Sequence, residues 1–181
     1  MLKNFLKKFT EEFTSHVQNE DTYKLDDLLS KIELIKKLKK KIIIIGNGGS
    51  AAIASHFSID LTKVVGIRSI NFNESSLLTC FSNDFGYEQW AAKAIEFYSD
   101  PDDLVILISS SGKSKNILNA AQTCKELNLN LVTFSGFNRS VPLYQLGDIN
   151  FCVQSNSYNI IESTHQFWLL SIIDYLIYEK N

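Results

Sequence analysis

Apolar residues along the chain follow two patterns in turn, one typical of strands and the other typical of helices. Strands are predicted where short apolar runs rich in β-branched residues stop at turn residues, over 42–45, 67–72, 104–108, 129–134 and 149–153. Helices are predicted where apolar residues recur at helical spacing, over 51–63, 74–82, 87–98, 114–127 and 160–178. This alternation predicts an α/β fold, with a doubly wound parallel sheet and helices on both of its faces.

Two further helices precede the first strand, over residues 2–17 and 25–38. They have no strand before them to pack on, so we expect this pair, residues 1–40, to pack on another subunit. The last helix, 160–178, is apolar nearly all round, and such a helix must be buried on every side. In a small domain this predicts a subunit interface, so the chain is expected to form a homo-oligomer.

Composition describes an ordinary globular chain. A length of 181 residues suits a single domain over 1–181. The net charge of −2 gives no reason to expect nucleic acid or an anionic membrane as a partner. No run approaches the roughly 18 apolar residues of a membrane-spanning helix, and the first residues lack the apolar core of a signal peptide. Cys80, Cys124 and Cys152 are far apart and have no metal-binding spacing, which predicts a reduced, cytoplasmic protein.

A glycine-rich turn follows the first strand, at residues 46–50. Three glycines in four positions let the backbone turn sharply and approach a ligand closely. Ser50 is expected to cap the next helix, whose N-terminus favours an anion because its N–H groups and its dipole point outward. On that helix His56 and Asp60 are four residues apart and share a face.

Three kinds of glycine turn compete for this stretch. A P-loop is excluded because no Gly-Lys-Ser/Thr closes the motif. A dinucleotide-binding turn needs an acidic residue at the end of the next strand, about 20 residues further on. That strand ends near Asn71 and Asn73, with Glu74 late, so no nucleotide cofactor is expected. A tight turn without a ligand remains the plain alternative.

A serine-rich loop follows the strand at 104–108 and opens the helix at 114–127. Its hydroxyls and backbone N–H groups, at a helix N-terminus, can hold a phosphate dianion without a metal or an arginine. A solvated turn with an N-cap is the alternative. Because ligands of open parallel sheets bind at the carboxyl ends of the strands, two anion-suited loops there favour a phosphate site.

Three motifs in this order resemble the sugar isomerase (SIS) domain, and within it phosphoheptose isomerase. They are GNGGSAA at 46–52 with His56 after it, NDFGYE at 83–88 and SSSGKS at 109–114. The resemblance implies a flavodoxin-like, three-layer fold with a five-stranded parallel sheet and two leading helices. It also implies a homotetramer with sites between subunits, and a phosphorylated sugar as the substrate.

The resemblance further implies which residues bind the sugar phosphate. Its phosphate cradle maps onto Ser109, Ser111 and Ser114. The full set of implied substrate-binding residues is Asn47, Gly48, Gly49, Ser50, Asp84, Ser109, Ser110, Ser111 and Ser114.

The catalytic positions depart from the family pattern. The family has a His-x-x-x-Glu pair and, on the last helix, a Gln and a His eight residues apart; these four can hold zinc, and the Glu and His act as acid and base. Here His56 is kept, while Asp60, Glu162 and Leu170 replace the Glu, the Gln and the second His. Asp60 and Glu162 are therefore candidate catalytic carboxylates, with Asp60 preferred, and His56, Asp60 and Glu162 are candidate zinc ligands. His165 matches another family histidine, about 140° around the helix from Leu170.

Two functions of different classes fit this pattern. The first is an aldose–ketose isomerase for sedoheptulose 7-phosphate or a related sugar of surface-polysaccharide (lipopolysaccharide) biosynthesis, since one poised carboxylate can move a proton between C1 and C2. The second is a non-catalytic SIS protein that binds a phosphosugar or a protein as a regulator or scaffold. Loss of the second His and of the family's Arg, which is Ile160 here, favours the second function, whereas both loops and His56 favour the first.

Overall fold

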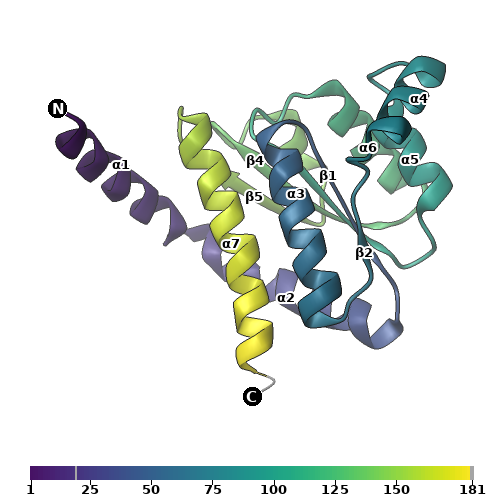
Figure 1. Cartoon of the computed structure of the whole chain (residues 1–181), viewed down its shortest axis with the longest axis horizontal. Coiled ribbons are helices and arrows are strands. Elements are labelled where there is room, and N and C mark those ends of the chain that lie inside the picture. Colours follow the sequence, from purple (N-terminus) through teal and green to yellow (C-terminus); the bar gives the residue numbers. More distant parts are fainter. Residues whose placement is uncertain (19, 180–181) are drawn as a thin grey trace.

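The computed structural model describes residues 1–18 and 20–179 (Figure 1). Helices and strands alternate along most of the chain, as the apolar pattern predicts. Their order is α1 (Leu2–Val17), η1 (Glu20–Tyr23), α2 (Lys24–Leu38), β1 (Ile42–Gly46), α3 (Gly49–Asp60), η2 (Leu61–Val65), β2 (Ser69–Ile70), α4 (Ser75–Phe85), α5 (Trp90–Tyr98), β3 (Leu104–Ser109), α6 (Lys115–Glu126), β4 (Asn130–Gly136), η3 (Pro142–Gln145), β5 (Ile149–Val153) and α7 (Tyr158–Tyr178).

The described residues form one five-stranded parallel sheet in the order β2-β1-β3-β4-β5. The chain moves outward in one direction from β1 to β2 and in the other from β3 to β5, so the switch point lies between β1 and β3. At that point Gly46 pairs with Ile108, so the glycine turn and the serine loop begin on adjacent strands. The predicted doubly wound fold is confirmed.

The isoleucines of β1 divide the core into two halves. Ile42 and Ile44 point into the core beneath α2, α3 and α7, whereas Ile43 and Ile45 point into the core beneath α5 and α6. Successive side chains of a strand face opposite sides of a sheet, so four consecutive apolar residues need cover on both faces. Figure 1 shows the resulting three layers.

Helix α2 lies on the chain's own sheet, so the expectation that it has no sheet to pack on is wrong, while its contact with another subunit stays a prediction. Its buried residues Leu28, Ile32 and Ile35 belong to the core that also contains α3 and α7. The chain returns from α2 into β1, an inner strand of the sheet, so this helix can cover the sheet beside β5 although no strand precedes it.

Helix α7 is also covered mainly by its own chain. Its apolar faces pack on α1, α3 and the sheet, and Trp168 Nε1 donates to the carbonyl of Val17 at 3.2 Å. Phe167 and Tyr175 remain about half exposed. The all-round apolar pattern therefore does not by itself require a second subunit, because three neighbours within the chain satisfy most of it.

His165 is a core residue between α7 and β4. It is fully buried, and its Nε2 lies 2.9 Å from the carbonyl oxygen of Ser135. Its ring meets Phe134 edge-on at 5.5 Å. Burial lowers the pKa of His165 to about 4, because the charged imidazolium would lose its hydration.

Truncation of α2 tests its place in the core. We expect Ile32→Ala to lower the free energy of unfolding by about 2–5 kcal/mol, because it removes a fully buried side chain from the packed face. Leu34→Ala, on the half-exposed side of the same helix, should cost much less. Denaturant unfolding measures both, and equal costs would contradict the packing of α2 on the sheet.

The buried His165 predicts a pH-dependent stability. Its folded pKa, about 4, lies below the ordinary value of 6.5, so the unfolded chain binds more protons between these pH values. The free energy of unfolding should therefore fall as the pH drops from 6.5 to 4, by about 3 kcal/mol at most. His165→Gln should flatten this part of the profile in urea titrations. An unchanged slope in that variant would assign the effect to other groups.

Candidate functional site

The glycine turn and the serine loop border one cavity at the carboxyl edge of the sheet. Its volume is about 270 Å³. The residues around it are Asn47, Gly48, Gly49, Ser50, Ile108, Ser109, Ser110, Ser111, Ser114, Tyr158 and Glu162. All of the substrate-binding residues predicted from the sequence are among them except Asp84.

The serine loop is folded so that hydroxyls and a helix end face the cavity. Gly112 adopts φ +62°, a conformation that favours glycine, and its N–H donates to the carbonyl of Ser109 at 2.8 Å. Ser109 Oγ donates to Ser114 Oγ at 3.2 Å, and Ser114 is the N-cap residue of α6. The positive end of the α6 dipole thus reaches the serines, which suits an anion.

The glycine turn brings a second helix end to the same cavity. Gly48, at φ +53°, is the N-cap of α3, so the prediction that Ser50 caps this helix is wrong. Ser50 lies within the first turn and is buried, with its Oγ 3.4 Å from Ser110 Oγ. A Cβ on Gly46 would come within 2.7 Å of Ser50, so glycine is required for this tight turn. Two helix N-termini therefore converge on one cavity.

Glu162 of α7 reaches the N-terminus of α3. A Cβ built on Gly49 would overlap the Glu162 carboxylate, so the two groups are in close contact because position 49 has no side chain. Ser110 Oγ donates to Glu162 Oε1 at 3.2 Å. A carboxylate at this place is stabilised by the positive end of the α3 dipole.

A second cavity, of about 380 Å³, lies between α3 and α7. It shares Gly49 and Glu162 with the first one and extends to His56. Besides Glu162, its polar lining on α7 consists of Asn159, Ser163 and Gln166. Glu162 therefore lies at the junction of the two cavities. The first cavity is rich in hydroxyls, which suit a phosphate, and the second is lined by polar groups that suit a polyhydroxylated chain.

Asp60 and His56 pair with each other at the C-terminal end of α3. His56 Nε2 lies 3.2 Å from Asp60 Oδ2, and the side chains are 50% and 27% exposed. His56 borders the second cavity, whereas Asp60 is not among the residues that line either cavity. The geometry thus places the preferred sequence candidate, Asp60, further from the phosphate-suited loops than Glu162.

The predicted zinc ligands are not gathered into one donor set. Within residues 1–18 and 20–179, no group of three His, Cys, Asp or Glu side chains is placed to hold a metal ion. Glu162 lies at the N-terminal end of α3, while the His56–Asp60 pair lies in its later turns. Within one chain, the three predicted ligands are therefore not positioned to bind one zinc ion together. The zinc site stays a prediction.

The NDFGYE motif contributes through Tyr87 and not through Asp84. Asp84 is exposed near the end of α4, where one carboxylate oxygen accepts from Asn83 Nδ2 at 2.9 Å. Tyr87 Oη donates to Asn47 Oδ1 at 3.3 Å and so connects the motif to the glycine turn. In this chain Asp84 lies outside the cavity that the other predicted residues line.

Two residues of this site were not predicted from the sequence, Asn116 and Tyr158. Asn116 is buried, and its amide exchanges hydrogen bonds of 3.0 and 2.9 Å with the amide of Asn47, which fixes Asn47 at the cavity. Tyr158 forms part of the cavity wall, and its ring packs edge-on against Phe137 at 5.2 Å. Both come from helix N-termini, where apolar periodicity carries no signal for polar side chains.

Comparison with known proteins agrees with this architecture. A family model described as the SIS domain matches residues 4–136. A phosphoheptose isomerase of Buchnera aphidicola is 35% identical over 164 residues, covering 88% of this chain and 79% of that protein. One from Helicobacter pylori is 33% identical over 178 residues, covering 91% of this chain and 90% of that protein.

The fold matches a solved structure of a phosphoheptose isomerase from Francisella tularensis. The TM-score is 0.88 at 21% identity, over 97% of this chain and 95% of that chain. In the described part of the chain, no helix is long and apolar enough to cross a membrane. The matched domain, the relatives of similar length and the two convergent loops lead to one assignment: the chain belongs to the phosphoheptose isomerase family of SIS-domain proteins.

Proposed function

We propose that this chain is a phosphosugar isomerase that interconverts sedoheptulose 7-phosphate and the corresponding aldose phosphate. The observation that carries this proposal is the place of Glu162, at the junction between a phosphate-suited cavity and a second polar cavity. Relatives covered over 79% and 90% of their own length bear the name phosphoheptose isomerase, which supports the same substrate class.

The first cavity supplies the phosphate site. The N-termini of α3 and α6 both face it, and each offers N–H groups and a positive dipole end. The hydroxyls of Ser111 and Ser114 can donate further hydrogen bonds to a phosphate dianion. A phosphate held here directs the rest of the open-chain sugar past Glu162 toward the second cavity.

The chemistry requires one base and one site for developing negative charge. The carboxylate of Glu162 removes a proton from C1, the C1–C2 double bond forms, and the electrons of the C2 carbonyl move to its oxygen. In this proposal the N-terminal N–H groups of α3 stabilise that enediolate oxygen. The O1 proton is then transferred to O2, and protonated Glu162 returns its proton to C2, which leaves a C1 carbonyl and a C2 hydroxyl and completes the aldose. Ser110 holds the carboxylate in place through its hydrogen bond.

The cellular setting is part of the proposal. Cys80, Cys124 and Cys152 are all free thiols, as expected of a protein in the reducing cytoplasm. A heptose phosphate made there would serve as a precursor for surface-polysaccharide, including lipopolysaccharide, biosynthesis.

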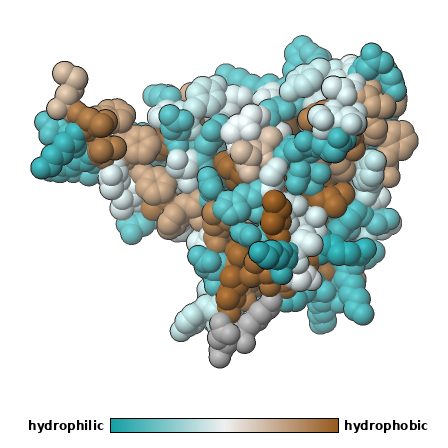
Figure 2. All heavy atoms as spheres, in the orientation of Figure 1, coloured by the Kyte–Doolittle hydropathy of each residue, from teal (hydrophilic) through white to brown (hydrophobic). Residues whose placement is uncertain are grey.

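A homo-oligomer, most simply the tetramer that the family resemblance implies, is proposed on the basis of α1. Its N-terminal half projects from the body of the molecule and carries apolar side chains in solvent (Figures 1 and 2). Phe5 and Leu6 are 58% and 53% exposed. Helical stability in proteins comes mostly from packing of the apolar face, so a neighbouring subunit is expected to cover the projecting half.

Replacement of the proposed base tests the function. Glu162→Gln should reduce turnover of sedoheptulose 7-phosphate by about 10²–10⁴-fold, because an amide cannot accept the proton, while binding of the sugar phosphate persists. Asp60→Asn is the matched control and should retain most of the activity. Isomerisation is followed by NMR and binding by calorimetry.

Each contrary outcome of this experiment has a distinct meaning. Loss of activity in Asp60→Asn but not in Glu162→Gln would make Asp60 the base. If the unaltered protein binds phosphosugars but converts none of them, the chain is a binding protein and not an isomerase.

Light scattering tests the assembly. We expect a mass that is a multiple of 20.5 kDa at micromolar concentration, and a smaller mass for the double substitution Phe5→Ser, Leu6→Ser, which removes the exposed apolar surface. Lys8→Ser, on the same helix, should leave the mass unchanged. A 20.5 kDa species for the unaltered protein would refute the oligomer.

A further inference from the structure

The loop after β4, residues 137–143, lies between the serine loop and the link between α1 and α2. We propose that Arg139 is a positioning residue for phosphate binding, which acts by holding this loop against the serine loop. This inference rests on the proposed phosphate site and goes beyond it, because Arg139 does not line the cavity as the described residues form it.

The 137–143 loop supports the serine loop at Gly112. The carbonyl of Gly112 accepts a hydrogen bond from Leu143 N at 3.2 Å. Val141 is buried against the Cα of Gly112, so closely that a Cβ there would lie 2.8 Å from Val141 Cβ. Gly112 sits between Ser111 and Ser114 in the loop, so a shift of Val141 moves the hydroxyls that face the cavity.

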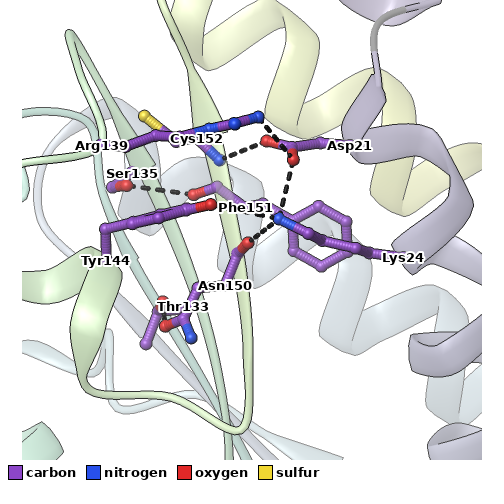
Figure 3. A network of polar contacts seen from close by, with 9 residues as sticks. All are labelled: Asp21, Lys24, Thr133, Ser135, Arg139, Tyr144, Asn150, Phe151 and Cys152. Carbon is purple, nitrogen blue, oxygen red and sulfur yellow. Dashed lines mark hydrogen bonds and ion pairs between the residues drawn. The ribbon is translucent and has the colours of Figure 1, made fainter.

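Arg139 anchors the other side of the same loop to a buried carboxylate (Figure 3). Its Nη2 lies 3.1 Å from Asp21 Oδ1, and Asp21 is fully buried. The carboxylate of Asp21 also accepts from Lys24 Nζ at 2.7 Å and from Cys152 N at 3.1 Å. Asp21 therefore joins three separate parts of the chain: the α1–α2 link, the edge strand β5 and the 137–143 loop.

The ring of Tyr144 completes this cluster. Lys24 Nζ lies 5.3 Å and Arg139 Cζ lies 5.9 Å from its centre, distances typical of cation–π contacts. Lys24 Nζ also donates to the carbonyl of Asn150 at 2.8 Å. Tyr144 comes directly after the loop. Arg139, at one end of the segment 139–144, pairs with Asp21, and Tyr144, at the other end, contacts the cations of Lys24 and Arg139.

The choice of substitution follows from burial. Removing Asp21 would leave two cations facing each other around a buried site, which destabilises the whole fold. The Arg139 side chain is partly exposed, so its replacement releases the loop with less effect on the core. Val141→Ala loosens the contact at Gly112 from the other side and leaves the charges intact.

Titration calorimetry with inorganic phosphate on the full chain tests the inference. Arg139→Gln and Val141→Ala should each weaken phosphate binding by roughly two- to thirty-fold, the range of couplings carried through packed networks. Arg139→Lys, which keeps the charge, should recover part of the affinity. In isomerisation assays Arg139→Gln should raise KM more than it lowers kcat, because the hydroxyls of Ser111 and Ser114 lie next to Gly112, whereas Glu162 keeps its contact with Gly49.

Lys31→Ala is the matched control. It removes an ion pair between α2 and Asp148, at 3.7 Å, that includes neither Asp21 nor a residue of the 137–143 loop, and should leave phosphate affinity unchanged. The inference is overturned if Arg139→Gln and Val141→Ala bind phosphate like the unaltered protein. It is also overturned if Lys31→Ala lowers the melting temperature as much as the two loop variants do and weakens phosphate binding as much as they do. If the unaltered protein binds no phosphate, the proposed phosphate site fails together with it.

Discussion

The site depends on one close contact, between the backbone of Gly49 and the carboxylate of Glu162. Because any side chain at position 49 would occupy the place of the carboxylate, the glycine turn and α7 approach each other this closely only with glycine at this position. The contact puts a negative charge at the positive end of α3 and between two polar cavities. Ser110 then connects the carboxylate to the serine loop through a hydrogen bond. The proposed base and the proposed phosphate site are therefore held together by this loop.

The elements that bring these groups together could be predicted from the sequence. The run Ile42 to Ile45 requires cover on both faces of a strand, and each isoleucine does enter the half of the core that alternation assigns to it. Once the sheet is parallel, loops that follow adjacent strands meet at one edge, which is why the loops at 46–50 and 109–114 border the same cavity. Local pattern and chain topology decide these features.

The remaining features depend on distances that no local pattern contains. The position of α2 on the sheet follows from the return of the chain into β1 and not from its own periodicity. Asp60 and Glu162 were both candidate bases, and their separation appears only when α3 and α7 are packed together. Asn116 and Arg139 act through partners far away in the chain, at Asn47 and at a buried carboxylate.

A crystal structure of Glu162→Gln with bound sedoheptulose 7-phosphate tests the central claim most directly. The account predicts a phosphate within hydrogen-bond distance, roughly 2.7–3.2 Å, of Ser111 and Ser114. It also predicts C1 and C2 about 3–3.5 Å from the side chain at position 162, near the N-terminus of α3. A phosphate bound elsewhere, or C1 and C2 placed beside Asp60 instead, would contradict the account.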